Sequence, residues 1–200
     1  MMDTILDDSK ALVFPYGRYL GKETGKVVLQ VSNDTYREMD SQWDSIIKAI
    51  ADAPDVKKIK SALSAAKQPD PTKYLQNLID NNILAVVDLG NIPFTISSIY
   101  DWVIYPTLTY EGKSKVPALS AMAQIMVSTP KMKTPFNISL FTMSVMTETT
   151  ASNGLTLGDI VPRLVAEMKV SLGMSEAELL SIFLNDLRKL IQRRGAFLGE

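Results

Sequence analysis

Three helix-like patterns follow one another in residues 33–82, and strand-like segments flank them on both sides. The first helix is predicted to begin at Asn33 or Asp34 and to end at Pro54, because its apolar residues recur every three or four positions, namely Tyr36, Met39, Trp43, Ile46, Ile47 and Ile50. A second helix is predicted over residues 55–66, and a third begins at Asp70-Pro71, an N-cap followed by proline. Residues 11–31 predict a hairpin around a glycine-bearing turn, and residues 83–87 predict a closing strand. This order of elements is that of a winged-helix unit.

The same apolar spacing recurs in the second half of the chain. Leu75, Leu78 and Ile79 match Leu187, Leu190 and Ile191, and Val56, Ile59 and Leu63 match Leu157, Ile160 and Leu164. The first set of matches is 112 residues apart (75 to 187) and the second 101 (56 to 157), so an extra turn or loop is predicted near 170–174. With 200 residues, the chain is long enough for two domains. The predicted fold is α+β: tandem winged-helix-like units over 1–90 and 91–200, mainly helical with short antiparallel hairpins.

The segment between the two helical regions is the hardest to assign. Residues 111–115 look like a turn, residues 117–127 fit either a helix or a strand, and residues 129–135 look like a loop. Capping boxes at Thr156–Asp159 and Ser175–Glu178 each predict a helix start. Gly195 is predicted to cap the last helix, with a short strand after it over 196–198.

The chain contains no histidine and no cysteine. This excludes disulfides, thiolate nucleophiles, Cys/His zinc sites and acid–base catalysis by histidine. We expect no catalytic residues, no metal site and no other cofactor. Residues 1–8 are acidic and lack an apolar signal core, and no apolar run reaches the length of about 18 residues typical of a membrane span. We therefore expect a cytoplasmic protein with no membrane partner.

Two groups of charged residues could bind ligands. The basic residues near the C-terminus could contact nucleic-acid phosphates, but they also suit a solvated helix end, which we favour; they are Arg188, Lys189, Arg193 and Arg194. The net charge of −1 also disfavours a nucleic-acid partner. The acidic residues at positions 34, 38, 40 and 44 could hold a cation, with Asp40 and Asp44 one helical turn apart, but a solvated face is the favoured interpretation.

The first half resembles the leader-peptide recognition element of ribosomal-peptide modification systems, which is similar to the small pyrroloquinoline-quinone peptide chaperone. The resemblance covers residues 12–87 and lies in the hairpin 12–31, the step Asn33–Asp40 into a helix bearing Trp43, and the closing segment Tyr74–Leu84. It implies that a peptide adds as a strand to the sheet and packs on the third helix. It places the groove between residues 26–31 and 71–82, lined by Val28, Gln30, Tyr74, Asn77 and Leu78.

Function therefore has several candidate classes. The favoured class is a non-catalytic adaptor that binds a peptide or protein partner and presents a leader peptide to a modifying enzyme. The alternatives are a winged-helix transcription regulator that binds DNA, and a scaffold or assembly subunit that uses the apolar segment 92–110 as an interface. Assembly into a homodimer is left open, and an enzyme is the least favoured class.

Overall fold

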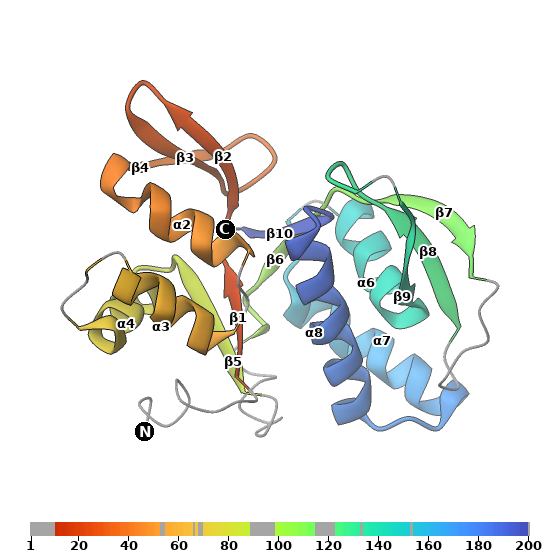
Figure 1. The fold of residues 1–200 in the computed structure, drawn as a ribbon. Coiled ribbons are helices and arrows are strands. Elements are labelled where there is room, and N and C mark those ends of the chain that lie inside the picture. Colours follow the sequence, from red (N-terminus) through yellow and green to blue (C-terminus); the bar gives the residue numbers. More distant parts are fainter. Residues whose placement is uncertain are drawn as a thin grey trace. The chain divides into compact units, whose positions relative to one another are not determined.

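The computed structural model describes residues 11–52, 55–65, 67, 70–88, 99–114, 123–132, 134–152 and 154–199. Within them the chain forms six α-helices and ten strands, and the strands make short antiparallel sheets (Figure 1). The fold class is therefore α+β. Contacts divide the chain into two compact units, residues 1–98 with 198–200, and residues 99–197. Among the described helices, none is both long and apolar enough to cross a membrane.

Over its described residues, the first unit has four strands, then three α-helices and then a fifth strand. In chain order these are β1 (Ala11–Pro15), β2 (Arg18–Glu23), β3 (Lys26–Gln30), β4 (Tyr36–Asp40), a 3₁₀ turn (Ser41–Trp43), α2 (Asp44–Asp52), α3 (Val56–Ala65), α4 (Pro71–Asp80) and β5 (Leu84–Asp88). Strands β2, β3 and β4 form one sheet with β3 in the middle, and β1 pairs separately with β5.

The second unit has the same order of strands and α-helices. Its elements are β6 (Val103–Pro106), β7 (Thr109–Lys113), β8 (Gln124–Ser128), β9 (Phe136–Ser139), α6 (Leu140–Ala151), α7 (Leu157–Leu172), α8 (Glu176–Gln192) and β10 (Ala196–Gly199). The sheet order is β7-β8-β9, and β6 pairs with β10, whose end is grouped with the first unit.

Local details agree at matching positions of the two units. The first hairpin of each sheet shifts register at a bulge, between Tyr19 and Gly21 in one unit and between Tyr110 and Gly112 in the other. Both glycines have φ of 129°. After the last helix, Ile83 N–H donates to Leu78 O over 2.9 Å in the first unit, while Gly195 N–H donates to Leu190 O over 2.7 Å in the second. These pairs fix which positions of the two units correspond.

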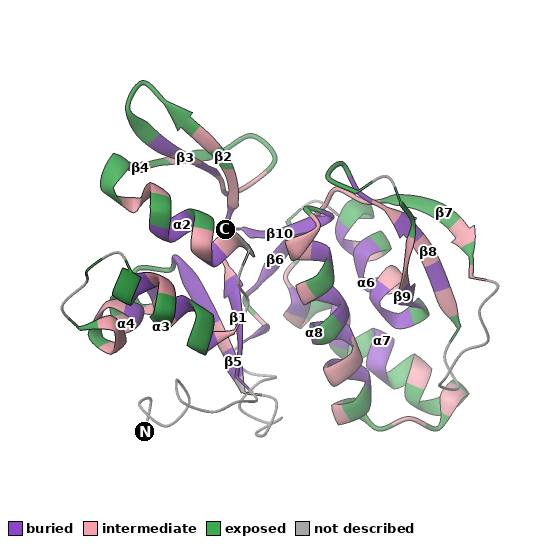
Figure 2. Cartoon of the chain, viewed as in Figure 1, coloured by how far each residue is buried: buried purple, intermediate pink, exposed green. Residues whose placement is uncertain are grey.

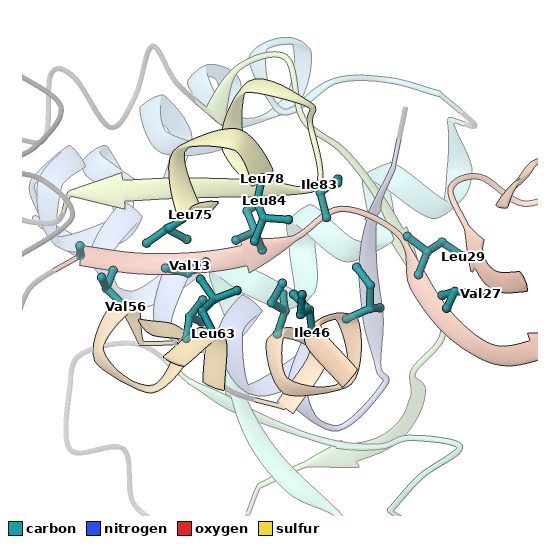
Figure 3. Packing of buried hydrophobic residues seen from close by; sticks show 14 of the residues in the cluster. Val13, Val27, Leu29, Ile46, Val56, Leu63, Leu75, Leu78, Ile83 and Leu84 are labelled. Carbon is teal, nitrogen blue, oxygen red and sulfur yellow. The ribbon is translucent and has the colours of Figure 1, made fainter. Parts of the chain in front are cut away.

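The core of the first unit lies between its sheet strands and its three helices. Val27 and Leu29 belong to it from β3, and Leu75 and Leu78, which are 0% exposed, belong to it from α4. Figure 3 shows Leu75 and Leu78 close to Val13 and Leu84, whereas Val27 and Leu29 lie farther along the core, beyond Ile46. In the second unit Phe141 of α6 and Phe183 of α8 pack edge to face, with ring centroids 6.2 Å apart. The helices of both units turn buried faces inward and exposed faces outward (Figure 2). Apolar burial of this kind supplies most of the stability of such units.

The helix predicted from residue 33 to residue 54 is wrong in its first part. Residues 36–40 form β4, and α2 begins only at Asp44. In β4 the side chains alternate, so Met39 faces the core opposite Val27 while Glu38 faces solvent. The spacing of Tyr36, Met39 and Trp43 fits a helix, but pairing with β3 gives this stretch its backbone hydrogen bonds.

Two smaller predictions also need correction. Residues 111–113, expected in a turn, continue strand β7. The extra residues of the second unit lie in its helices rather than in a loop, because α7 has 16 residues against 10 in α3, and α8 has 17 against 10 in α4. The hairpin predicted over 11–31 is formed by β2 and β3, while β1 pairs elsewhere.

Several predicted elements are confirmed. Helices α3 and α4 lie close to their predicted bounds, and the Asp70 carboxylate caps α4 by accepting from Lys73 N–H over 3.0 Å. The capping boxes at Thr156 and Ser175 are present, as are the strands after α4 and α8. Residues 124–127 form a strand, whereas residues 117–122 and 92–98 of the segments considered above lie outside the described residues.

Gly195 is required for close packing rather than as a helix cap. Arg193 is the cap of α8, and Arg194 carries the left-handed φ of 57°. A Cβ on Gly195 would lie 2.7 Å from Thr129 Cγ2 and 3.0 Å from Leu190 Cδ2. The chain passes too close to its neighbours here for a larger residue.

We expect Gly195→Ala to lower the free energy of unfolding by about 1–3 kcal/mol, the usual cost of overpacking. Urea unfolding of the variant measures this. Arg194→Gly is the matched control, because glycine adopts the left-handed conformation without strain and should leave stability unchanged or raise it. Equal loss in the two variants would contradict the packing explanation.

Candidate functional site

The five residues expected to line the peptide groove do not share one surface. Val28 and Gln30 point away from the core side of β3, because their neighbours Val27 and Leu29 point toward it. Leu78 is 0% exposed and belongs to the core, and Tyr74 packs partly buried against the same core. Only Asn77 of the three α4 residues is exposed. The prediction that these five residues line one groove is therefore wrong.

The strand chosen for peptide addition is also wrong. β3 pairs with β2 on one side and with β4 on the other, so both of its edges are already hydrogen-bonded. An incoming strand can add only at an outer edge of this sheet, which means β2 or β4.

At the β2 edge the side chains are tied to α2. Asp44, at the start of α2, accepts from Tyr19 Oη over 2.6 Å and from Lys48 Nζ over 2.8 Å, and it lies 3.4 Å from Lys22 Nζ. Its side chain is 14% exposed. Hydrogen bonds from Lys48, Tyr19 and Lys22 lower the pKa of Asp44 from 3.8 to about 2. The hydrogen bond to Asp44 in turn raises the pKa of Tyr19. This cluster joins sheet to helix.

The Asp44 cluster predicts sensitivity to acid. Because the pKa of Asp44 is lower in the folded chain than its ordinary value of 3.8, the ionised carboxylate stabilises the fold above pH 4 and this contribution is lost as the pH falls toward 2. We expect the stability difference between the wild type and Asp44→Asn to shrink over that interval, measured by urea unfolding at several pH values. A difference independent of pH would contradict the assignment.

The β4 edge is different, because its exposed positions carry an aromatic ring and two carboxylates. Tyr36 is 56% exposed, and Glu38 and Asp40 are exposed. Lys26 pairs with Glu38 over 2.9 Å, and its pKa is raised chiefly by Glu38 and to a smaller extent by the charge of Asp40, which lies opposite it. The edge is therefore polar, accessible and negatively charged.

Two side-chain contacts connect the β4 region with α4 and the residues after it. A guanidinium N–H of Arg37 donates to Asn82 O, just past the end of α4, over 3.4 Å. Near the other end of β4, the ring of Trp43 lies 5.5 Å from the ring of Tyr74. These contacts link the two ends of the β4 region to Tyr74 and to the residue just past α4, and neither of them involves Asn77.

The second unit contains a buried polar network that the sequence analysis missed. Asp186 of α8 is 5% exposed and accepts from Ser139 N–H over 2.8 Å and from Thr142 Oγ1 over 3.0 Å. Lys189 lies 3.0 Å from its other oxygen and leads out to solvent. The sequence pattern could have indicated this network, because Asp186 lies within the apolar helix face formed by Phe183, Leu187 and Leu190. A charge at such a position is normally hydrogen-bonded within the fold.

The basic residues near the C-terminus do not form one free patch. Lys189 is paired with Asp186, and the Arg193 guanidinium lies 4.0 Å from the centre of the Phe136 ring. Arg188 is half-buried, and Arg194 is exposed. This arrangement favours a structural role for Lys189 and Arg193 over phosphate contacts.

The acidic residues expected to be a solvated group are spread over three elements. Asp40 ends β4 and Asp44 begins α2, so the two do not lie one turn apart on a helix. Among the described residues, no three acidic side chains gather as a metal site would require. Comparison with protein-family models, with curated proteins and with solved structures finds no match to this chain.

Proposed function

We propose that this chain is a non-catalytic peptide-binding protein that takes up an extended peptide as an additional strand along β4. The observation that carries the proposal is the outer edge of β4, which pairs with no other strand among the described residues and carries exposed side chains. An edge strand offers a row of unpaired backbone groups to an incoming chain. The backbone hydrogen bonds supply affinity, and neighbouring side chains supply specificity.

The side chains beside this edge suit a basic peptide. Asp34, Glu38 and Asp40 outnumber the two cations near them, Arg37 and Lys26. Tyr36 offers exposed aromatic surface, while Trp43 and Tyr74 are partly buried. A second copy of this chain is a poorer fit. Antiparallel pairing of two β4 strands about their centre would place Glu38 opposite Glu38, and like charges in that position are destabilising.

We further propose that the two units are copies of one winged-helix-like unit. Support comes from the repeated order of elements, from the bulges at Gly21 and Gly112, and from the matching hydrogen bonds at Ile83 and Gly195. In this scheme the three-stranded sheet is the wing and the three helices that follow are the helical part. The proposal that the chain is an adaptor that presents a peptide to a modifying enzyme rests on the resemblance of the first unit to the leader-peptide recognition element.

The test uses peptides selected from a random-sequence library displayed on phage, with the full chain as the target. Selected peptides should be rich in Lys and Arg, should bind more weakly at high salt, and should shift the amide signals of residues 36–40 and of Tyr74 and Asn77. Scrambled peptides of the same composition are the control. Failure to enrich any peptide, or shifts confined to other elements, would overturn the proposal.

A further inference from the structure

We infer that only the first unit takes up a peptide, because the second unit closes its own sheet edge with α8. This inference rests on the proposed function for its binding half, while the closure of β9 stands on contacts within the second unit. The chain would then carry two related units, of which one binds and the other is closed.

In the second unit the outer edge of β9 is occupied at its Ser139 end. The backbone N–H of Ser139, the last residue of β9, donates to the Asp186 carboxylate of α8 over 2.8 Å, and both residues are buried. At the other end of the strand, the Arg193 guanidinium covers the Phe136 ring at 4.0 Å. The Asp186 carboxylate of α8 therefore occupies the outward backbone N–H at the end of β9, which an added strand would need.

The first unit has different residues at the matching positions. The hydrogen bonds at Ile83 and Gly195 align Tyr74 of α4 with Asp186 of α8, 112 residues later (78 to 190). The Tyr74 ring lies 5.5 Å from the Trp43 ring at an angle of 39°, and among the described residues no hydrogen bond joins Tyr74 to β4. The pairing of Lys26 with Asp40 and of Gln124 with Ser139 makes Asp40 the counterpart of Ser139. A carboxylate that could close β4 from α4 is therefore missing at this position.

Matched proline substitutions separate the two edges. Glu38, opposite Val28, and Asn137, opposite Met126, occupy equivalent edge positions two residues before Asp40 and Ser139. Backbone N–H groups two residues apart in an antiparallel strand point to the same side, so the N–H groups of Glu38 and Asn137 point outward, as the N–H of Ser139 does. Proline there removes the outward donor while sparing the bonds to the neighbouring strand.

The experiment measures binding of a library-selected peptide to the full chain and to Asn137→Pro, together with amide hydrogen exchange by NMR. We expect Asn137→Pro to bind the peptide with unchanged affinity, and we expect Ser139 N–H to exchange slowly with and without peptide. Weaker binding by Asn137→Pro, new protection along β9 on adding peptide, or fast exchange of Ser139 in the free chain would each overturn the inference. If no peptide binds, the proposed function fails, and exchange at Ser139 still decides whether β9 is closed.

Discussion

Asp186→Ala is expected to lower the free energy of unfolding by about 2–3 kcal/mol. The buried carboxylate accepts from Ser139 N–H and from the Thr142 hydroxyl, and both of these donors lie at positions at most 1% exposed. Alanine leaves the backbone donor without a partner, and a buried unpaired polar group costs about 1–3 kcal/mol. Loss of packing within the apolar face of α8 adds to this. Denaturant unfolding followed by the fluorescence of Trp102, which is 2% exposed in the same unit, measures the change.

Lys189→Ala is the matched control for this prediction. The Lys189 side chain is 51% exposed, so its pair with Asp186 resembles a surface ion pair, which contributes only about 0–1 kcal/mol. The two hydrogen bonds that Asp186 accepts from β9 and α6 remain in that variant. Equal destabilisation by the two substitutions would show that the ion pair, not the hydrogen-bonded carboxylate, holds α8 against β9.

Glu38→Pro is expected to weaken binding of a library-selected peptide by at least about tenfold, which corresponds to about 1.4 kcal/mol. Proline removes the outward N–H at the centre of β4 and places a ring where the added strand would lie. The edge position lets the fold tolerate the change, since the bonds between β3 and β4 come from the neighbouring residues. Isothermal titration calorimetry gives the affinity, and circular dichroism checks that the variant is folded.

Glu38→Gln separates the backbone effect of the proline from the loss of charge. It keeps the N–H and the size of the side chain but removes the negative charge that Lys26 now faces over 2.9 Å. We expect a small loss of affinity for basic peptides, screened by salt. If Glu38→Gln weakened binding as much as Glu38→Pro, side-chain charge rather than strand addition would account for the interaction.

The sequence predicts the helices better than the sheets. Asp70-Pro71 and the Ser175–Glu178 box mark helix starts by local hydrogen bonds, and these predictions are confirmed. β4 was missed because its identity depends on pairing with β3, a contact that lies outside its own sequence window. The candidate site was predicted on the wrong strand for the same reason. The order of strands in the sheet decides that β3 is central, and that order cannot be read from one strand alone.

Individual residues show the same limit. Leu78 suits a groove by its helical spacing, but it points into a core that only the folded unit creates. Asp186 could have been found from its place between Phe183 and Leu187, yet its partner Ser139 lies 47 residues away along the chain. Arg193 looked like a solvated cation and instead lies over the ring of Phe136. Contacts between distant segments decided each of these cases.

The most direct test of strand addition at β4 is a measurement of cross-strand nuclear Overhauser effects between a bound, library-selected peptide and the isotope-labelled full chain. We expect contacts between peptide α-protons or amide protons and the backbone protons of Tyr36, Glu38 and Asp40, in the regular pattern of paired strands. A bound peptide that showed its contacts elsewhere, with none along residues 36–40, would contradict the account.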